Sequence, residues 1–255
     1  MVKDVKQYSL QKILLLWLLI TVPMGLLSWV IAPLVIPISP LEAAFTYWIL
    51  MIIGLVWQFI VSSAVIWSEL KTFNWQQIRR RTWLVAPVDP KTKQPRMILF
   101  LWLIPAIAVA LLIIPLTDFL DTAWINLLDR VAPSLQSPPY AVISVLRNYD
   151  MTGQWSLLGL AIITAIFNYF LGEEFFFRGV LLPKMEGVFG RWDWVANSAL
   201  FALYHVHKPW ALPGIFIGLL NYTYPSKVFR SIWFSIILHG IEGVILIAIV
   251  LAVIL

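Results

Sequence analysis

The stretch WSLLGLAIITAIFNYFLGEEFFFRGVLL, residues 155–182, decides how this chain folds and where its chemistry lies. It carries no charge before Glu173 and Glu174, and it is long enough to cross a bilayer, since a spanning helix needs roughly 20 apolar residues. A pair of carboxylates within such a helix is costly and is usually kept for function. We therefore expect a transmembrane helix that places two carboxylates at membrane depth.

The composition of the whole chain indicates a helical membrane protein. Of its 255 residues, 61% are hydrophobic and 12% are charged, which is about half the charged fraction of a soluble domain. The apolar runs lack the alternation of period two that a β-barrel requires. We predict an all-α fold, a polytopic transmembrane helix bundle that forms a single unit from residue 1 to residue 255.

Composition also excludes several function classes. The chain contains no cysteine, so disulfides, thiolate metal sites and a cysteine nucleophile are excluded. Its net charge of +5 does not predict nucleic-acid binding, because basic residues in so apolar a chain mark the cytoplasmic side and face anionic lipid. The expected partner is the lipid bilayer, together with a membrane-associated substrate, and not nucleic acid.

Seven apolar segments are expected to cross the membrane: residues 13–36, 44–67, 97–116, 155–182, 192–206, 209–226 and 229–255. Basic residues are concentrated before the first segment and between the second and third segments. An even number of crossings separates these two regions, so both can lie in the cytoplasm, as the positive-inside rule requires. We predict a multi-pass protein of the plasma (inner) membrane with a cytoplasmic N-terminus and a first segment that is not a cleaved signal peptide.

Two of the connecting segments carry their own expectations. Residues 75–84 form either a short helix in the membrane interface or a solvated loop, because apolar residues such as Trp75 and Trp83 flank a run of three arginines there. Residues 118–153 are expected to be a loop on the opposite side of the membrane, with a short interfacial helix near Trp124.

Two histidines later in the chain are expected to reach the depth of Glu173. With a rise of 1.5 Å per residue, Glu173 lies about 14 Å, His205 about 20 Å and His239 about 15 Å from the cytoplasmic ends of their helices. These depths agree within the uncertainty of helix boundaries. Three separate helices therefore bring a carboxylate and two imidazoles to one layer of the membrane.

Several kinds of chemistry suit such a cluster. A carboxylate beside an imidazole can take a proton from water and so make a nucleophile for an amide carbonyl, while a second imidazole stabilises the oxyanion. Two histidines and one glutamate are also the ligands of many catalytic zinc sites. Intramembrane Glu and His side chains serve as proton relays too, although a chain without internal repeats fits a transporter poorly. Residue types alone leave an enzyme, a transporter and a structural or interaction protein open.

Glu174 and Arg178 are one helical turn apart and can form an ion pair. Such a pair usually stabilises the structure. Alternatively, the arginine could bind the C-terminal carboxylate of a substrate.

The order and spacing of these residues resemble those of a known family. Residues 173–178, EEFFFR, match an EExxxR motif, residues 201–205, FALYH, match FxxxH, and His239 stands where an HxxxN or HxxxD motif would begin. The chain thereby resembles the CAAX-protease and bacteriocin-processing (CPBP) family of intramembrane endopeptidases, which includes the Ras-converting CAAX enzyme. The resemblance covers residues 171–243, and the catalytic core is expected at about residues 154–255.

This resemblance implies hydrolysis of a peptide bond in a membrane-associated substrate, with a CAAX-type prenylated tail as the best-known target. Carried over by position, Glu173 would be the base that activates water with the help of His205, and His239 would stabilise the oxyanion. Glu174 and Arg178 would have supporting roles. This mechanism needs no cofactor. The alternative is a zinc-dependent intramembrane protease in which Glu173, His205 and His239 hold the metal.

One position departs from the family pattern. Gly243 stands four residues after His239, where the family has Asn or Asp. Glu242 lies on a face similar to that of His239 and is one candidate to replace the missing polar group. His207 is another, although residues two apart on a helix point in different directions. The departure leaves a non-proteolytic role open, such as bacteriocin immunity or assembly of a membrane complex.

Overall fold

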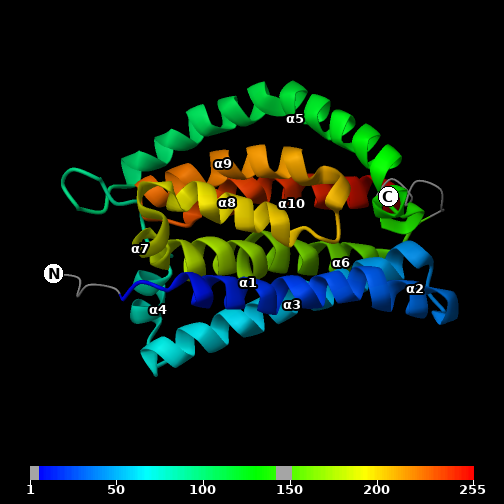
Figure 1. Cartoon of the computed structure of the whole chain (residues 1–255), viewed down its shortest axis with the longest axis horizontal. Coiled ribbons are helices and arrows are strands. Elements are labelled where there is room, and N and C mark those ends of the chain that lie inside the picture. The colour runs from blue at the N-terminus through cyan, green and yellow to red at the C-terminus, as the bar shows by residue number, and fades with distance from the viewer. Residues whose placement is uncertain (1–5, 142–150) are drawn as a thin grey trace.

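The computed structural model describes residues 6–141 and 151–255. Within these ranges the chain forms helices and no strands, so the predicted all-α fold is confirmed (Figure 1). Residues 142–150, in the second predicted loop, lie outside the described part, as do residues 1–5.

The described helices follow one another in the order of their labels. The N-terminal half contains α1 (Leu10–Leu26), a π-helical turn (Leu27–Ile31), α2 (Ala32–Val35), α3 (Ala43–Leu70), α4 (Trp75–Arg81) and α5 (Leu103–Val131), which is preceded by a 3₁₀ segment (Met97–Trp102). The C-terminal half contains α6 (Trp155–Ile166), two π-helical segments (Phe167–Gly172 and Phe175–Leu181), α7 (Glu186–Phe189), α8 (Asp193–Tyr204), α9 (Leu212–Val228) and α10 (Trp233–Ile254). The long helices run nearly parallel or antiparallel to one another, with α5 outermost on one side and α1 to α3 on the other (Figure 1).

Five helical segments of the described chain are long and apolar enough to cross a membrane. They are Leu10–Ile38, Ala43–Leu70, Met97–Val131, Trp155–Lys184 and Trp233–Ile254. The two other predicted spans correspond to α8 and α9, which are about 18 and 25 Å long at 1.5 Å per residue, shorter than the hydrocarbon core of roughly 30 Å. The structure supports five spans, and the count of seven stays a prediction.

The segment that differs most from the prediction is the third apolar run. A loop was expected from residue 118, but the helix that begins at Met97 runs on to Val131. No glycine or proline interrupts residues 116–132, and Pro133 follows directly after. Because proline is the residue that breaks a helix most strongly, the helix continues to Val131, shortly before Pro133.

In the first connecting segment, residues 75–81 form α4, so of the two alternatives considered for that segment the helix is the one observed.

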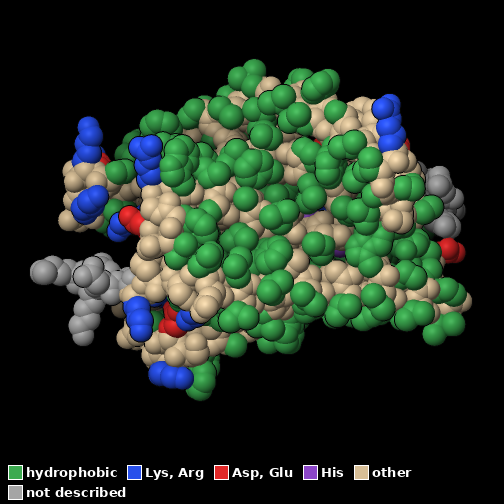
Figure 2. All heavy atoms as spheres, in the orientation of Figure 1, with side chains coloured by type: hydrophobic (Ala, Val, Ile, Leu, Met, Phe, Trp, Pro, Cys, Tyr) green, Lys and Arg blue, Asp and Glu red, His purple; other side chains and the backbone are tan. Residues whose placement is uncertain are grey.

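Charged side chains are distributed unevenly over the bundle. Most lysine and arginine side chains visible in Figure 2 lie at the end where the chain begins, while apolar side chains cover the middle. The predicted cytoplasmic N-terminus rests on this asymmetry.

The helix formed by the opening stretch is not a regular α-helix. Its two π-helical segments lie on either side of Glu173 and Glu174, and such segments are rare and occur mostly at functional sites. A Cβ on Gly172 would meet the backbone oxygen of Phe167 in the same π-helical segment and the backbone oxygen of Leu55 in α3. Glycine therefore permits both the π-helical turn and the close contact with α3. The path of the chain next to the two glutamates therefore requires glycine.

Gly172→Ala should lower the free energy of unfolding by about 1–3 kcal/mol, because the added methyl group would push the helix away from α3. Thermal unfolding of the purified protein in detergent micelles would detect this as a lower Tm. Gly159→Ala is the matched control in α6, since no atom lies within 4 Å of its added Cβ. An unchanged Tm for Gly172→Ala would contradict the close packing.

Candidate active site

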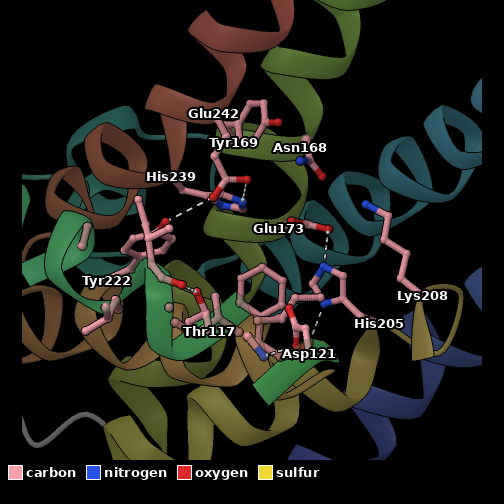
Figure 3. A pocket seen from close by; sticks show the side chains of 18 residues that line it. Thr117, Asp121, Asn168, Tyr169, Glu173, His205, Lys208, Tyr222, His239 and Glu242 are labelled. Carbon is pink, nitrogen blue, oxygen red and sulfur yellow. Dashed lines mark hydrogen bonds and ion pairs between the residues drawn. The ribbon is translucent and has the colours of Figure 1, made fainter. Parts of the chain in front are cut away.

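The side chains singled out in the sequence meet in the middle of the bundle (Figure 3). Glu173 and Glu174 come from the helix that begins with α6, His205 follows the last residue of α8, and His239 lies in α10. All four are buried. A cavity of about 350 Å³, here called the central cavity, is lined by Glu173, His205 and His239. The convergence inferred from helix depths is thus observed.

His205 and Glu173 face each other across a short gap. His205 Nε2 lies 3.8 Å from Glu173 Oε1, while His205 Nδ1 lies 2.9 Å from the backbone oxygen of Phe201. A carbonyl oxygen only accepts hydrogen bonds, so in the neutral ring Nδ1 carries the hydrogen and Nε2 presents a lone pair to Glu173. The gap is too long for a direct hydrogen bond. Two acceptors at this separation can each take one hydrogen of the same water molecule.

Asn168 holds the carboxylate of Glu173 from the other side. With its amide nitrogen turned toward the carboxylate, Asn168 donates to both oxygens of Glu173, at 3.1 and 3.2 Å. Residues five apart come together in a π-helix, whose hydrogen bonds span five residues. Asn168 was not predicted from the sequence, because a spacing of five does not correspond to one face of an α-helix. A polar residue in an otherwise apolar span was the available signal.

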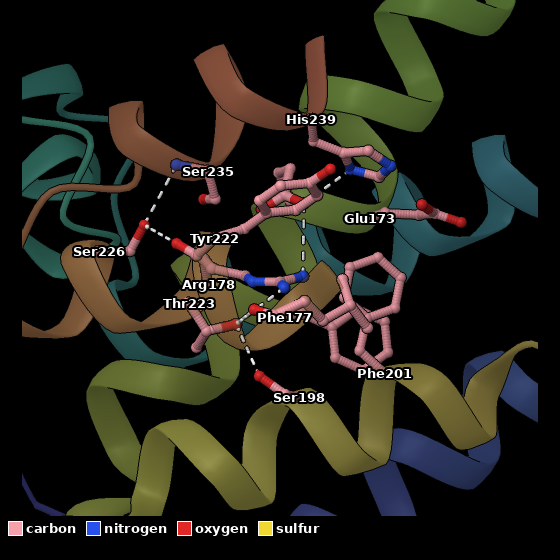
Figure 4. Close-up of polar contacts among 12 residues, drawn as sticks. Glu173, Phe177, Arg178, Ser198, Phe201, Tyr222, Thr223, Ser226, Ser235 and His239 are labelled. Carbon is pink, nitrogen blue, oxygen red and sulfur yellow. Dashed lines mark hydrogen bonds and ion pairs between the residues drawn. The ribbon is translucent and has the colours of Figure 1, made fainter. Parts of the chain in front are cut away.

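Glu174 does not line the central cavity, and Figure 4 shows its partners Arg178 and His239. Its Oε1 accepts a hydrogen bond from His239 Nδ1 at 2.9 Å and lies 3.3 Å from Arg178 Nη1. Arg178 Nη2 donates to Thr223 Oγ1 at 2.9 Å. Since Glu174 and Arg178 have no exposed surface, this pair fixes the helices relative to one another. Arg178 offers no surface to the carboxylate of a substrate.

Tyr169 explains the departure from the family pattern at Gly243. A Cβ on Gly243 would lie 2.6 and 2.7 Å from two carbons of the Tyr169 ring. The ring therefore occupies the space that a side chain at this position would need. Tyr169 also lines the central cavity and contacts His239 edge-on, with ring centroids 4.7 Å apart. The missing polar group of the family is thus replaced by an aromatic ring from the neighbouring helix.

Of the two polar residues considered as substitutes, Glu242 lies at the central cavity and His207 does not line it. Glu242 Oε2 is 3.8 Å from His239 Nε2, and Glu242 Oε1 accepts a hydrogen bond from the hydroxyl of Tyr222 at 3.1 Å. His239 therefore lies between two carboxylates, those of Glu174 and Glu242. Tyr222 was not predicted from the sequence as a residue of this site.

The histidines and acids of the central cavity are also the side chains that a zinc enzyme would use. Within residues 6–141 and 151–255, no three His, Cys, Asp or Glu side chains form a group that could hold a metal ion. Glu173, His205 and His239, which a zinc enzyme would use, share a cavity without forming such a group. The Nδ1 atoms of the two histidines contact the carbonyl of Phe201 and the carboxylate of Glu174. Zinc-bound histidines make the same kind of contact through their second ring nitrogen, so these contacts do not distinguish the glutamate mechanism from the zinc-dependent one.

Comparisons with known proteins point to the same part of the chain. Residues 154–245 match the model of a family described as Type II CAAX prenyl endopeptidase Rce1-like. No curated protein and no solved structure matches the chain. The matched range contains Glu173, His205 and His239 and most of the helices that form the central cavity. With its apolar helices and this match, the chain is an integral membrane protein whose residues 154–245 are similar to CAAX prenyl endopeptidases.

Proposed function

We propose that this protein is an intramembrane endopeptidase in which Glu173 and His205 activate water to hydrolyse a peptide bond. The observation that carries this proposal is the pair of acceptors, Glu173 Oε1 and His205 Nε2, which lie 3.8 Å apart at a buried cavity. The match to a protease family supports the reaction class. Water that donates to both acceptors turns an oxygen lone pair toward the cavity, where a substrate carbonyl would lie.

The reaction follows from this arrangement. The bound water gives one proton to Glu173 while its oxygen forms a bond to the carbonyl carbon, and the carbonyl oxygen becomes an oxyanion. The C–N bond then breaks, and the protonated Glu173 returns its proton to the departing amine. Asn168 keeps the carboxylate in place by donating to both of its oxygens. His205 accepts the second hydrogen of the water and orients it.

His239 is placed to stabilise the oxyanion. Its Nδ1 donates to Glu174, so Nε2 carries a hydrogen when the ring is protonated. The carboxylates of Glu174 and Glu242 flank the ring as counter-ions, at 2.9 and 3.8 Å. A protonated His239 presents an N–H group to the central cavity, and a donor fixed in place before the reaction is an effective oxyanion stabiliser.

An apolar cavity beside the site supports a lipidated substrate. A cavity of about 760 Å³, here called the lateral cavity, lies between α5 and α9 and is lined by residues such as Trp102 and Phe229. Ile113 lines both this cavity and the central cavity, so the two adjoin. The description of the matched family names a prenyl endopeptidase. A prenyl chain is a flexible hydrocarbon that suits an apolar cavity. We assign the lateral cavity to the prenyl group of a membrane-associated peptide.

Glu173→Gln should reduce kcat by about 10²–10⁴-fold, because the amide cannot accept the proton of the water. Cleavage of a prenylated fluorogenic peptide by the purified protein in lipid vesicles would measure the loss. Glu42→Gln, an exposed site outside the cavities, is the control and should retain full activity. Full activity of Glu173→Gln with an unchanged Tm would rule out the catalytic role and favour a non-proteolytic role in immunity or complex assembly.

Cleavage should persist when the protein is incubated with a metal chelator, because the proposed steps use only side chains of the chain itself. The same peptide assay, run before and after dialysis against chelator and again with added zinc, would check this. Activity that disappears with the chelator and returns with zinc would replace the proposed mechanism with the zinc-dependent alternative.

Val109→Trp should raise KM for a prenylated peptide by about tenfold, because the indole would fill part of the lateral cavity and displace hydrocarbon. The KM of a peptide without the prenyl group should not change. Leu111→Trp on the same helix is the matched control, since Leu111 is 64% exposed and lines none of the cavities described above. Equal effects of Val109→Trp on both peptides would contradict the assignment of the lateral cavity.

A further inference from the structure

Lys208 is a basic residue that lies beside the proposed catalytic residues Glu173 and His205 (Figure 3). It lines the central cavity and also a second cavity of about 530 Å³, here called the inner cavity, on the side of α3. Both cavities are lined by Glu173 as well. Among the described residues that line either cavity, Lys208 is the one lysine or arginine.

The backbone around Lys208 is fixed although it is not helical. Side chains from three other parts of the chain donate to its carbonyl groups: Trp29 to Val206 at 2.7 Å, Tyr47 to His207 at 3.4 Å and Trp124 to Pro209 at 2.7 Å. The amide of Lys208 itself donates to the carbonyl of His205 at 2.8 Å. Because backbone groups outside a helix need hydrogen-bond partners inside a protein, these contacts fix the segment and keep Lys208 close to His205.

The ammonium group of Lys208 has no carboxylate partner within 4.0 Å among the described residues. The three acids that line the central cavity already have other partners: Glu173 with Asn168, Asp121 with the amide of Gly214, and Glu242 with Tyr222. Lys208 is exposed, so its ammonium group is accessible to an anion that enters either cavity.

We propose that Lys208 binds the C-terminal carboxylate of the peptide substrate and thereby fixes how many residues the enzyme releases. This inference rests on the proposed endopeptidase function. In a prenylated C-terminal peptide, the lipid precedes the scissile bond and the carboxylate follows it. The structure offers the matching order: the lateral cavity, then Glu173, then Lys208. Because Lys208 shares two cavities with Glu173, the anion it binds belongs to the molecule that is cleaved, and fixing this end orients the scissile carbonyl.

Two prenylated peptides that differ only at the C-terminus, one a free carboxylate and one an amide, test the proposal. Wild-type protein in vesicles of neutral phosphatidylcholine should cleave the carboxylate peptide with a kcat/KM about 10- to 100-fold higher, mainly through KM, since a charge-assisted contact is lost in the amide. Lys208→Met should no longer distinguish the two peptides, and Lys208→Arg should keep the preference. Lys71→Met, a change outside the cavities, should behave as wild type.

Binding of the same two peptides to Glu173→Gln separates this inference from the proposed function. Preferential binding of the carboxylate peptide that disappears in Glu173→Gln/Lys208→Met supports the role of Lys208, even if the wild type cleaves neither peptide. Equal cleavage and equal binding of the two peptides would overturn the proposal while leaving the endopeptidase standing. It is also overturned if the preference survives in Lys208→Met, or if anionic phosphatidylglycerol vesicles abolish it, because Lys208 would then be a site for lipid phosphate.

Discussion

Glu174 accepts a hydrogen bond from His239 and forms an ion pair with Arg178. Neither its carboxylate nor the guanidinium of Arg178 has any exposed surface. A buried pair of this kind is costly to assemble, but once it is assembled the loss of one partner leaves an uncompensated charge, at a cost of about 3–5 kcal/mol. The contact joins the motif helix to α10, and through Thr223 it also reaches α9. Adjacent residues of a helix point in different directions, so fixing Glu174 inside the protein turns Glu173 toward the central cavity. Two neighbouring glutamates thus acquire different roles from their surroundings alone.

The arrangement of this site could be predicted in part because helix geometry is simple. A constant rise per residue places Glu173, His205 and His239 at similar depths, and the structure brings all three to the central cavity. The all-α fold was predictable for the same kind of reason, since long uncharged runs leave few alternatives in a membrane. The position of a residue along a helix follows directly from its number in the sequence, so its depth in the membrane is predictable.

Some residues of the site were not predicted from the sequence. Their roles depend on local irregularity of the backbone or on contacts between segments that are distant in the sequence. Asn168 reaches Glu173 through a π-helical turn, whose period cannot be told from an apolar sequence that would also suit an α-helix. Gly243 was interpreted as the loss of a polar group, whereas the Tyr169 ring fills that space from another helix. Lys208 gains its place from the aromatic donors of three separate segments. None of these relationships is encoded by spacing within a single helix.

The early end of α8 shows how such irregularity serves the chemistry. A span was expected to continue to residue 206, but the helix ends at Tyr204. The amide of His205 bonds to Ala202 rather than to Phe201, as in a tightened last turn. The carbonyl of Phe201 is therefore available to the imidazole of His205, and accepts from its Nδ1 at 2.9 Å. This contact fixes the tautomer, so that Nε2 faces Glu173 with a lone pair. Had α8 continued as a regular helix, the amide of His205 would also donate to that carbonyl, and the imidazole would have to share the acceptor that sets its orientation.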